Sequence, residues 1–147
     1  MSNMDEAYYL LDSVAIIRLD KSILAGDFVK KHCRISEEVV NEVRHRKKIS
    51  MLEENVIPVT PKVLSIARDL LTTNADSKGL IDLYKNEGNG DILQLATIIV
   101  EKEKVSLTLN LFNTNWTLVT DDIGLSTFAE SLGINAISSD EFKVIAA

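Results

Sequence analysis

The segment "WTLVTDD", residues 116–122, guides the interpretation of the whole sequence. Residues 117–120 have the composition of a buried strand, and two aspartates, Asp121 and Asp122, follow it directly. Adjacent carboxylates repel each other, and each charge costs free energy to remove from water. A pair of acids at the end of an apolar strand therefore needs an explanation, either as a helix cap or as part of a site.

Strands and helices are predicted to alternate on both sides of this segment. We expect strands at 7–11, 33–35, 55–59, 116–120 and 134–138, the third at a sheet edge because of its proline. We expect helices at 22–32, 36–48, 60–74 and 77–86, another from about residue 92, and a last one at 123–133. Residues 104–115 fit either a strand or a continued helix. This alternation predicts an α/β fold with a mainly parallel sheet.

The composition predicts a single folded domain over residues 1–147. Hydrophobic residues make up 46% of the chain, and there is no repeat, low-complexity segment or linker. We expect no membrane association, because the apolar runs are short and the N-terminal residues lack the basic region of a signal peptide. A cytoplasmic location is the default expectation. The single cysteine, Cys33, excludes an internal disulfide and is interpreted as a core residue.

The charge distribution contains one basic segment. The net charge is −6, but residues 30–48 hold seven of the sixteen lysines and arginines and only three acids. The cations in "RHRKK", residues 44–48, have two interpretations. They are either a solvated helix end, where positive charge suits the helix dipole, or a contact for a polyanion.

Acids follow two of the expected strands and lie on two of the expected helices. Asp12 follows the first strand, and Asp121 and Asp122 follow the strand at 116–120. In open α/β sheets, ligands bind beyond the carboxyl ends of the strands, so these acids are expected to come together there. Glu42 lies on the helix after the second strand, and Asp91 opens the helix that follows "NEGNG".

Each acid also has a simpler structural interpretation. Asp91 alone is a helix cap, Glu42 alone is a solvated helix residue, and the Asp121–Asp122 pair could cap the last helix. Asp12 is harder to explain by a structural role alone, because the apolar sequence continues directly after it with no turn residue. Taken together, converging acids would form a pocket of like charge unless a cation occupied it, and oxygen ligands suit hard ions such as Mg²⁺ and Mn²⁺.

Other chemistries find little support in the sequence. His32 and His45 have no partners at zinc-ligand spacing, and one cysteine cannot build a thiolate site. The "GNGDIL" loop lacks the third glycine of a dinucleotide fingerprint and the Lys-Ser/Thr of a phosphate-binding loop. The G-x-S-x-G elbow of serine hydrolases does not occur.

Four segments in order resemble the motifs of the PIN-domain nucleases. "LLDSVAII" is similar to the first motif, and "ISEEVVNEV", with Ser36 and Glu42, to the second. "GDILQLATIIVEK" is similar to the third, and "LVTDDIGLSTFAESLGINAI" to the fourth. The resemblance implies a three-layer α/β/α sandwich and a Mg²⁺- or Mn²⁺-dependent ribonuclease.

The resemblance also implies roles for individual residues. The catalytic and metal-binding acids would be Asp12, Glu42, Asp91, Asp121 and Asp122. A T-x-D pattern selects Asp122, whereas Asp121 is nearer the strand end, so both are kept. Ser13 and Thr120 would be hydroxyls that orient the carboxylates. Arg44, Arg46, Lys47 and Lys48 follow Glu42 on the same expected helix and would bind RNA phosphates.

The resemblance also implies partners, and the sequence leaves other functions open. Many small members of the family are VapC-type toxins, which pair with an antitoxin protein and often form homodimers, and others are stand-alone nucleases. The main alternative is a non-catalytic module, either a receiver-like phosphoacceptor domain or an inactive PIN fold. A receiver domain normally has an acidic pair near its first strand, whereas this chain has the single Asp12 there.

Overall fold

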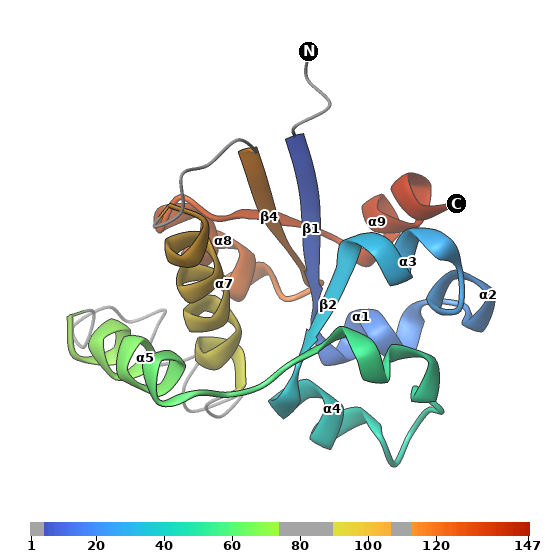
Figure 1. Cartoon of the computed structure of the whole chain (residues 1–147), viewed down its shortest axis with the longest axis horizontal. Coiled ribbons are helices and arrows are strands. Elements are labelled where there is room, and N and C mark those ends of the chain that lie inside the picture. Colours follow the sequence, from blue (N-terminus) through green and yellow to red (C-terminus); the bar gives the residue numbers. More distant parts are fainter. Residues whose placement is uncertain (1–4, 74–89, 107–112) are drawn as a thin grey trace.

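The computed structural model describes residues 5–73, 90–106 and 113–147 of the chain. A parallel sheet of five strands, in the order β3-β2-β1-β4-β5, lies between two groups of helices (Figure 1). The strands are β1 (Asp5–Leu11), β2 (Cys33–Ser36), β3 (Val56–Ile57), β4 (Asn113–Val119) and β5 (Asn135–Ile137). The α/β prediction with a parallel sheet is confirmed, and the layers are those of a three-layer α/β/α sandwich.

The central strand β1 separates the early strands from the late ones. Tyr9 pairs with Cys33 of β2 on one side and with Thr117 of β4 on the other. The chain therefore adds strands to one edge of β1 first and to its opposite edge later. Such a reversal of strand order opens a crevice at the carboxyl ends of the strands, where ligands bind in folds of this kind.

One face of the sheet is covered by the helices of the first third of the chain and by the last helix. These are α1 (Ser13–Arg18), α2 (Lys21–Leu24), α3 (Asp27–His32), α4 (Glu37–Val43), the 3₁₀ helix η2 (Ser50–Asn55) and α9 (Ser139–Ala146). Leu11, Ile35 and Val119 contribute to this core from the strands. Since side chains alternate along a strand, the neighbouring Leu10 and Leu118 point to the other face.

The second face is covered by α7 (Gly90–Ser106) and α8 (Ile123–Ser131), and α5 (Pro61–Thr73) packs outside α7 (Figure 1). The start of α5 is as predicted, with Pro61 in the first turn and the Thr60 hydroxyl accepting from the N–H of Val63 at 3.2 Å. The expected helix at 77–86 lies outside the described residues, as do residues 107–112 of the ambiguous segment.

Three helices differ from the prediction. The helix α1 starts directly after Asp12, where no helix was expected. The expected helix at 22–32 is divided into α2 and α3 at Gly26, where a Cβ atom would lie only 3.2 Å from the carbonyl oxygen of Ile23. The helix α4 ends at Val43 rather than at residue 48, so "RHRKK" follows the helix as a turn.

The C-terminal helix α9 was also missed. Ser138 and Glu141 form a reciprocal capping box at its start, and this Ser-x-x-Glu pattern is visible in the sequence. In the described part of the chain, no helix combines the length and the apolar character needed to cross a membrane.

Candidate functional site at the carboxyl edge of the sheet

The acids that follow β1 and β4 are fixed at neighbouring strand ends by the backbone. The N–H of Asp12 donates to the carbonyl of Val119 at 3.1 Å, and the N–H of Thr120 donates to the carbonyl of Ile137 at 2.9 Å. These two hydrogen bonds extend the pairing of the sheet by one residue beyond the strands. The residues that follow β1, β4 and β5 therefore lie side by side at one edge.

Asp12 is a buried carboxylate at the centre of this edge. Its side chain is 6% exposed, and its Oδ1 caps α1 by accepting from the N–H of Ala15 at 2.7 Å. Burial raises the pKa of the Asp12 carboxyl group above its ordinary value, although hydrogen bonds from Thr120 and Ala15 act in the opposite direction. The nearby charges of Asp121 and Asp122 raise this pKa further.

Thr120 connects the two strand ends. Its buried hydroxyl bonds to the Asp12 carboxylate and also accepts from the backbone N–H of Asp122 at 3.1 Å. The hydroxyl therefore fixes the position of Asp12 relative to the start of α8. Ser13, the other hydroxyl residue of the prediction, is half-buried in the first turn of α1.

The Asp121 carboxylate is held by two partners, Ser139 and Arg18. Its Oδ1 accepts from the N–H of Ser139 at 2.9 Å, and its Oδ2 accepts from the Ser139 hydroxyl at 2.7 Å and from Arg18 Nη1 at 3.0 Å. Partial burial alone would raise the pKa of Asp121, but the Ser139 hydrogen bonds and the Arg18 guanidinium outweigh it and hold the pKa below its ordinary value. Both oxygens of this carboxylate are thus occupied.

Asp122 is the N-cap of α8. Its Oδ1 accepts from the N–H of Leu125 at 2.9 Å, so the helix-cap interpretation of the acidic pair holds for this residue. The two adjacent aspartates therefore accept hydrogen bonds from different partners. The geometry favours Asp122 over Asp121 as a ligand, because Arg18 already balances the charge of Asp121.

Of the two remaining acids of the predicted site, only Glu42 has a described side chain. Glu42 is exposed on α4. Glu38, one turn earlier, lines a pocket with Ile92 and Leu93, so this side of α4 faces the first turns of α7. Asp91 belongs to the first turn of α7, but its side chain is outside the described ones.

The carboxylate groups at this edge fit the coordination of a hard cation only in part. Asp12 and Asp122 supply carboxylate oxygens, which suit Mg²⁺ or Mn²⁺. Asp121 does not fit, because it is committed to Arg18 and Ser139. Among the described side chains, no three Asp, Glu, His or Cys residues come close enough together to hold a metal ion.

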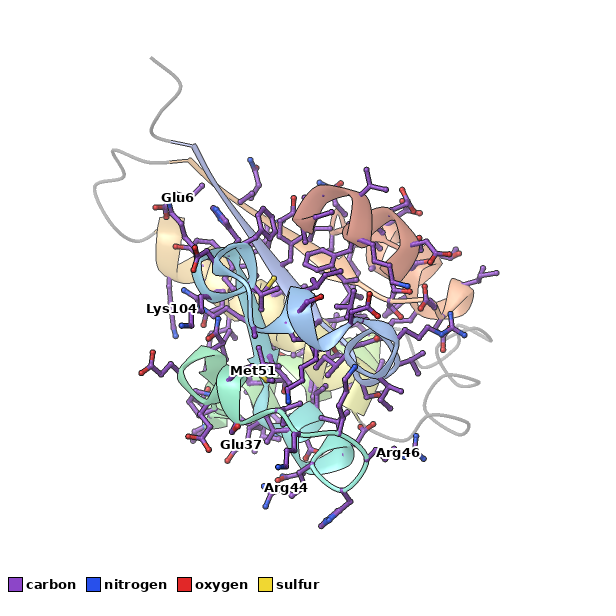
Figure 2. The ribbon with its side chains drawn as sticks, turned by 90° about the vertical axis from the view of Figure 1, so that its right-hand side faces the viewer. Glu6, Glu37, Arg44, Arg46, Met51 and Lys104 are labelled. Atoms are coloured by element: carbon purple, nitrogen blue, oxygen red, sulfur yellow. The ribbon has the colours of Figure 1, made fainter. Side chains whose placement is uncertain are left out.

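The four basic residues expected to bind RNA have different surroundings. The ammonium group of Lys47 donates to the carbonyl oxygens of Ile16 at 3.0 Å, Ile17 at 3.1 Å and Leu19, at the end of α1. Arg44, Arg46 and Lys48 are exposed, and Figure 2 shows that Arg44 and Arg46 extend from the turn in different directions. Lys47 is therefore a structural cation, whereas the other three are available to a ligand.

Sequence reasoning missed two residues of this edge, Ser139 and Arg18. Ser139 directly follows the strand expected at 134–138, so the rule that placed Asp12 at the edge could also have found it. Ser36, which the second motif of the resemblance already includes, is fully buried at the end of β2, where it caps α4. Arg18 gave no signal, because the helix that carries it was not predicted.

Comparison of the chain with models of known protein families and with curated proteins finds no match.

Proposed function

We propose that the chain is a Mg²⁺- or Mn²⁺-dependent endoribonuclease of the PIN type, with its site at the carboxyl edge of the sheet. The observation that carries this proposal is the buried Asp12 at the end of β1, next to Asp121 and Asp122 at the end of β4. A carboxylate in this position has an unfavourable charge, which a divalent cation would neutralise. The crevice of a parallel sheet at a reversal of strand order is also where ligands bind.

The residues of the edge would have distinct roles. Asp12 and Asp122 would hold the ion, with Asp91 and Glu42 as the further ligands that the sequence resemblance implies. Thr120 orients Asp12, and the Asp121–Arg18 pair keeps a guanidinium beside the site. A bound divalent ion supplies an activated water and stabilises the charge that develops on a phosphate. An antitoxin partner and a homodimer stay predictions from the resemblance.

One observation favours a non-catalytic alternative. The Arg18 guanidinium lies 3.0 Å from Asp121 and already supplies a positive charge at the acidic edge. An inactive PIN fold that serves as a scaffold would use such an ion pair in place of a metal. This alternative predicts neither metal binding nor cleavage.

Cleavage of a fluorescently labelled single-stranded RNA tests the proposal. Activity should disappear with EDTA and return with Mn²⁺ or Mg²⁺, and Asp12→Asn prepared in parallel should stay inactive in all conditions. Activity that survives thorough chelation would refute the metal requirement. Equal activity of wild type and Asp12→Asn would identify a contaminating ribonuclease and leave the chain without demonstrated activity.

A further inference from the structure

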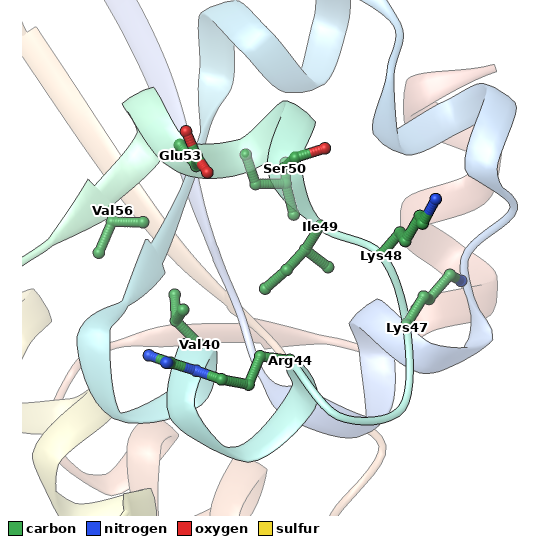
Figure 3. Close-up of a pocket in the computed structure, with 9 residues that line it drawn as sticks. Val40, Arg44, Lys47, Lys48, Ile49, Ser50, Glu53 and Val56 are labelled. Carbon is green, nitrogen blue, oxygen red and sulfur yellow. The ribbon is translucent and has the colours of Figure 1, made fainter.

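A pocket of about 490 Å³ lies between α4, the basic turn and η2. Its lining consists of Val40, Arg44, Lys47, Lys48, Ile49, Ser50, Leu52, Glu53 and Val56 (Figure 3). Residues two apart on a helix lie on nearly opposite sides, so the side of α4 that carries Glu42 is not the side that leads to Arg44. Asp12, Glu42, Asp121 and Asp122 are not among the described residues that line the pocket.

The walls of this pocket are held by buried and partly buried hydrogen bonds. The Asn55 amide, 4% exposed at the end of η2, donates to the carbonyls of Val29 at 3.1 Å and Lys30 at 3.2 Å, and to that of Cys33 at 2.6 Å. On the other side, Lys47 fastens the turn to the end of α1. A pocket with fixed walls is preformed, so a ligand would not have to order them.

The pocket combines an apolar floor with the forked hydrogen-bond donors of one guanidinium group, that of Arg44. Figure 3 shows Val40, Ile49 and Val56 facing a common space, with the Arg44 guanidinium on one side and Glu53 on the other. Asn41 orients Arg44 by accepting from its Nη2 at 2.5 Å.

The two lysines contribute less to this space. Their ammonium groups point away from Ile49 (Figure 3), and the three N–H donors of Lys47 match the three carbonyls of α1 that they contact. Arg44 is thus the cation that an occupant would meet.

We propose that this pocket is a nucleotide-binding site. The base would pack on Val40, Ile49 and Val56, and the phosphate would pair with the forked guanidinium of Arg44, which matches phosphate geometry. Glu53 lies where it would accept a hydrogen bond from an exocyclic amino group, which selects cytosine or adenine over uracil. Glu53 would repel an acidic peptide, so the same residue argues against that class of ligand.

The inference is independent of RNA cleavage, and binding is measured in EDTA. In calorimetric titrations, 5′-CMP and 5′-AMP should bind, and 5′-UMP should bind more weakly. Arg44→Ala should weaken CMP binding about tenfold or more, the scale of a lost charge-assisted pair. Arg46→Ala is the matched control: it removes the same charge from the same turn outside the pocket and should change affinity less than about twofold.

Two further variants sharpen the result. Glu53→Gln should abolish the preference for CMP over UMP. Arg44→Lys keeps the charge but not the fork, so its affinity for CMP should lie between those of wild type and Arg44→Ala.

A short poly-cytidine RNA, titrated by fluorescence anisotropy, distinguishes the two sources of the nucleotide, an RNA strand and a free nucleotide. Tighter binding of the RNA than of CMP, weakened more by Arg44→Ala than by Arg46→Ala, assigns the pocket to a strand. Equal or weaker binding of the RNA assigns it to a free nucleotide.

Several outcomes would overturn the proposal. Equal losses in Arg44→Ala and Arg46→Ala would mean that the turn acts only as diffuse positive charge. Binding of an acidic peptide by a protein that binds no nucleotide would assign the pocket to a protein partner. Asp12→Asn should bind CMP with the affinity of wild type. The pocket proposal can therefore hold even if the chain proves not to cleave RNA.

Discussion

Asp12 and Lys47 bind opposite ends of the same six-residue helix, α1. Asp12 accepts from an N–H at the start of α1, and the ammonium group of Lys47 contacts the carbonyls at its end. Both charges have the sign that the helix dipole favours at that end. The basic turn after α4 therefore supports the helix that positions the buried acid.

The first prediction concerns this support. Lys47→Met keeps the aliphatic stem but removes the donors from three carbonyl groups, so the free energy of unfolding should fall by about 1–3 kcal/mol in urea denaturation. Arg46→Met is the control, since the exposed Arg46 should stay within about 0.5 kcal/mol of wild type. Equal stability of the two variants would contradict the capping role of Lys47.

The second prediction follows from the raised pKa of Asp12. Between pH 3.8 and the raised pKa, the Asp12 carboxyl group is mostly protonated in the folded state but mostly ionised in the unfolded state. The free energy of unfolding therefore falls as the pH rises through this window. In EDTA, Asp12→Asn should match wild type at acid pH. It should exceed wild type at neutral pH by on the order of 1 kcal/mol, because asparagine also caps a helix. A less stable variant at neutral pH would show that the charge of Asp12 is favourable without metal.

The third prediction has the opposite sign, because the pKa of Asp121 is lowered. Its charge stabilises the fold above the ordinary value of 3.8, and this stabilisation is lost as the pH falls through the lowered pKa. Asp121→Asn should therefore be less stable than wild type at neutral pH, by about 1 kcal/mol or less, since Arg18 is 59% exposed. The difference should shrink in acid, and a constant difference across the pH range would exclude an electrostatic origin.

The fourth prediction separates the two adjacent aspartates. With EDTA, Asp122→Asn should melt like wild type, because asparagine is as good an N-cap as aspartate. An ion that binds only the folded chain raises the melting temperature by mass action. We expect Mn²⁺ to raise it for wild type and for Asp121→Asn, but much less for Asp122→Asn. A full Mn²⁺ shift in Asp122→Asn would remove this residue from the proposed ligands.

The sequence was informative where a local pattern has one structural solution. Pro61 after Thr60 marked a helix start, and the apolar runs that end before Asp12 and Asp121 marked two of the strands. The sequence misled where tertiary contacts decide. The residues 44–48 look like a helix end, but α4 ends at Val43 and the ammonium group of Lys47 binds the carbonyl end of α1.

The candidate site was predictable to a similar degree. The edge rule brought Asp12 together with Asp121 and Asp122 across more than a hundred residues, and their mutual effect on the pKa of Asp12 agrees with it. The rule does not say how each carboxylate is oriented. That Asp121 turns to Arg18 depends on α1, whose apolar residues continue the pattern of β1 without a break in composition.

The register of β1 has a consequence for the order of synthesis. Leu11 pairs with Val119, and the N–H of Asp12 needs the carbonyl of the same residue. A nascent chain made at about 5–20 residues per second reaches this partner roughly 5–20 s after Asp12 has been added. Until then β1 has one open edge and Asp12 has no acidic neighbours from β4. If the chain cuts RNA as proposed, this order keeps the acidic edge incomplete until the segment up to Val119 has been translated.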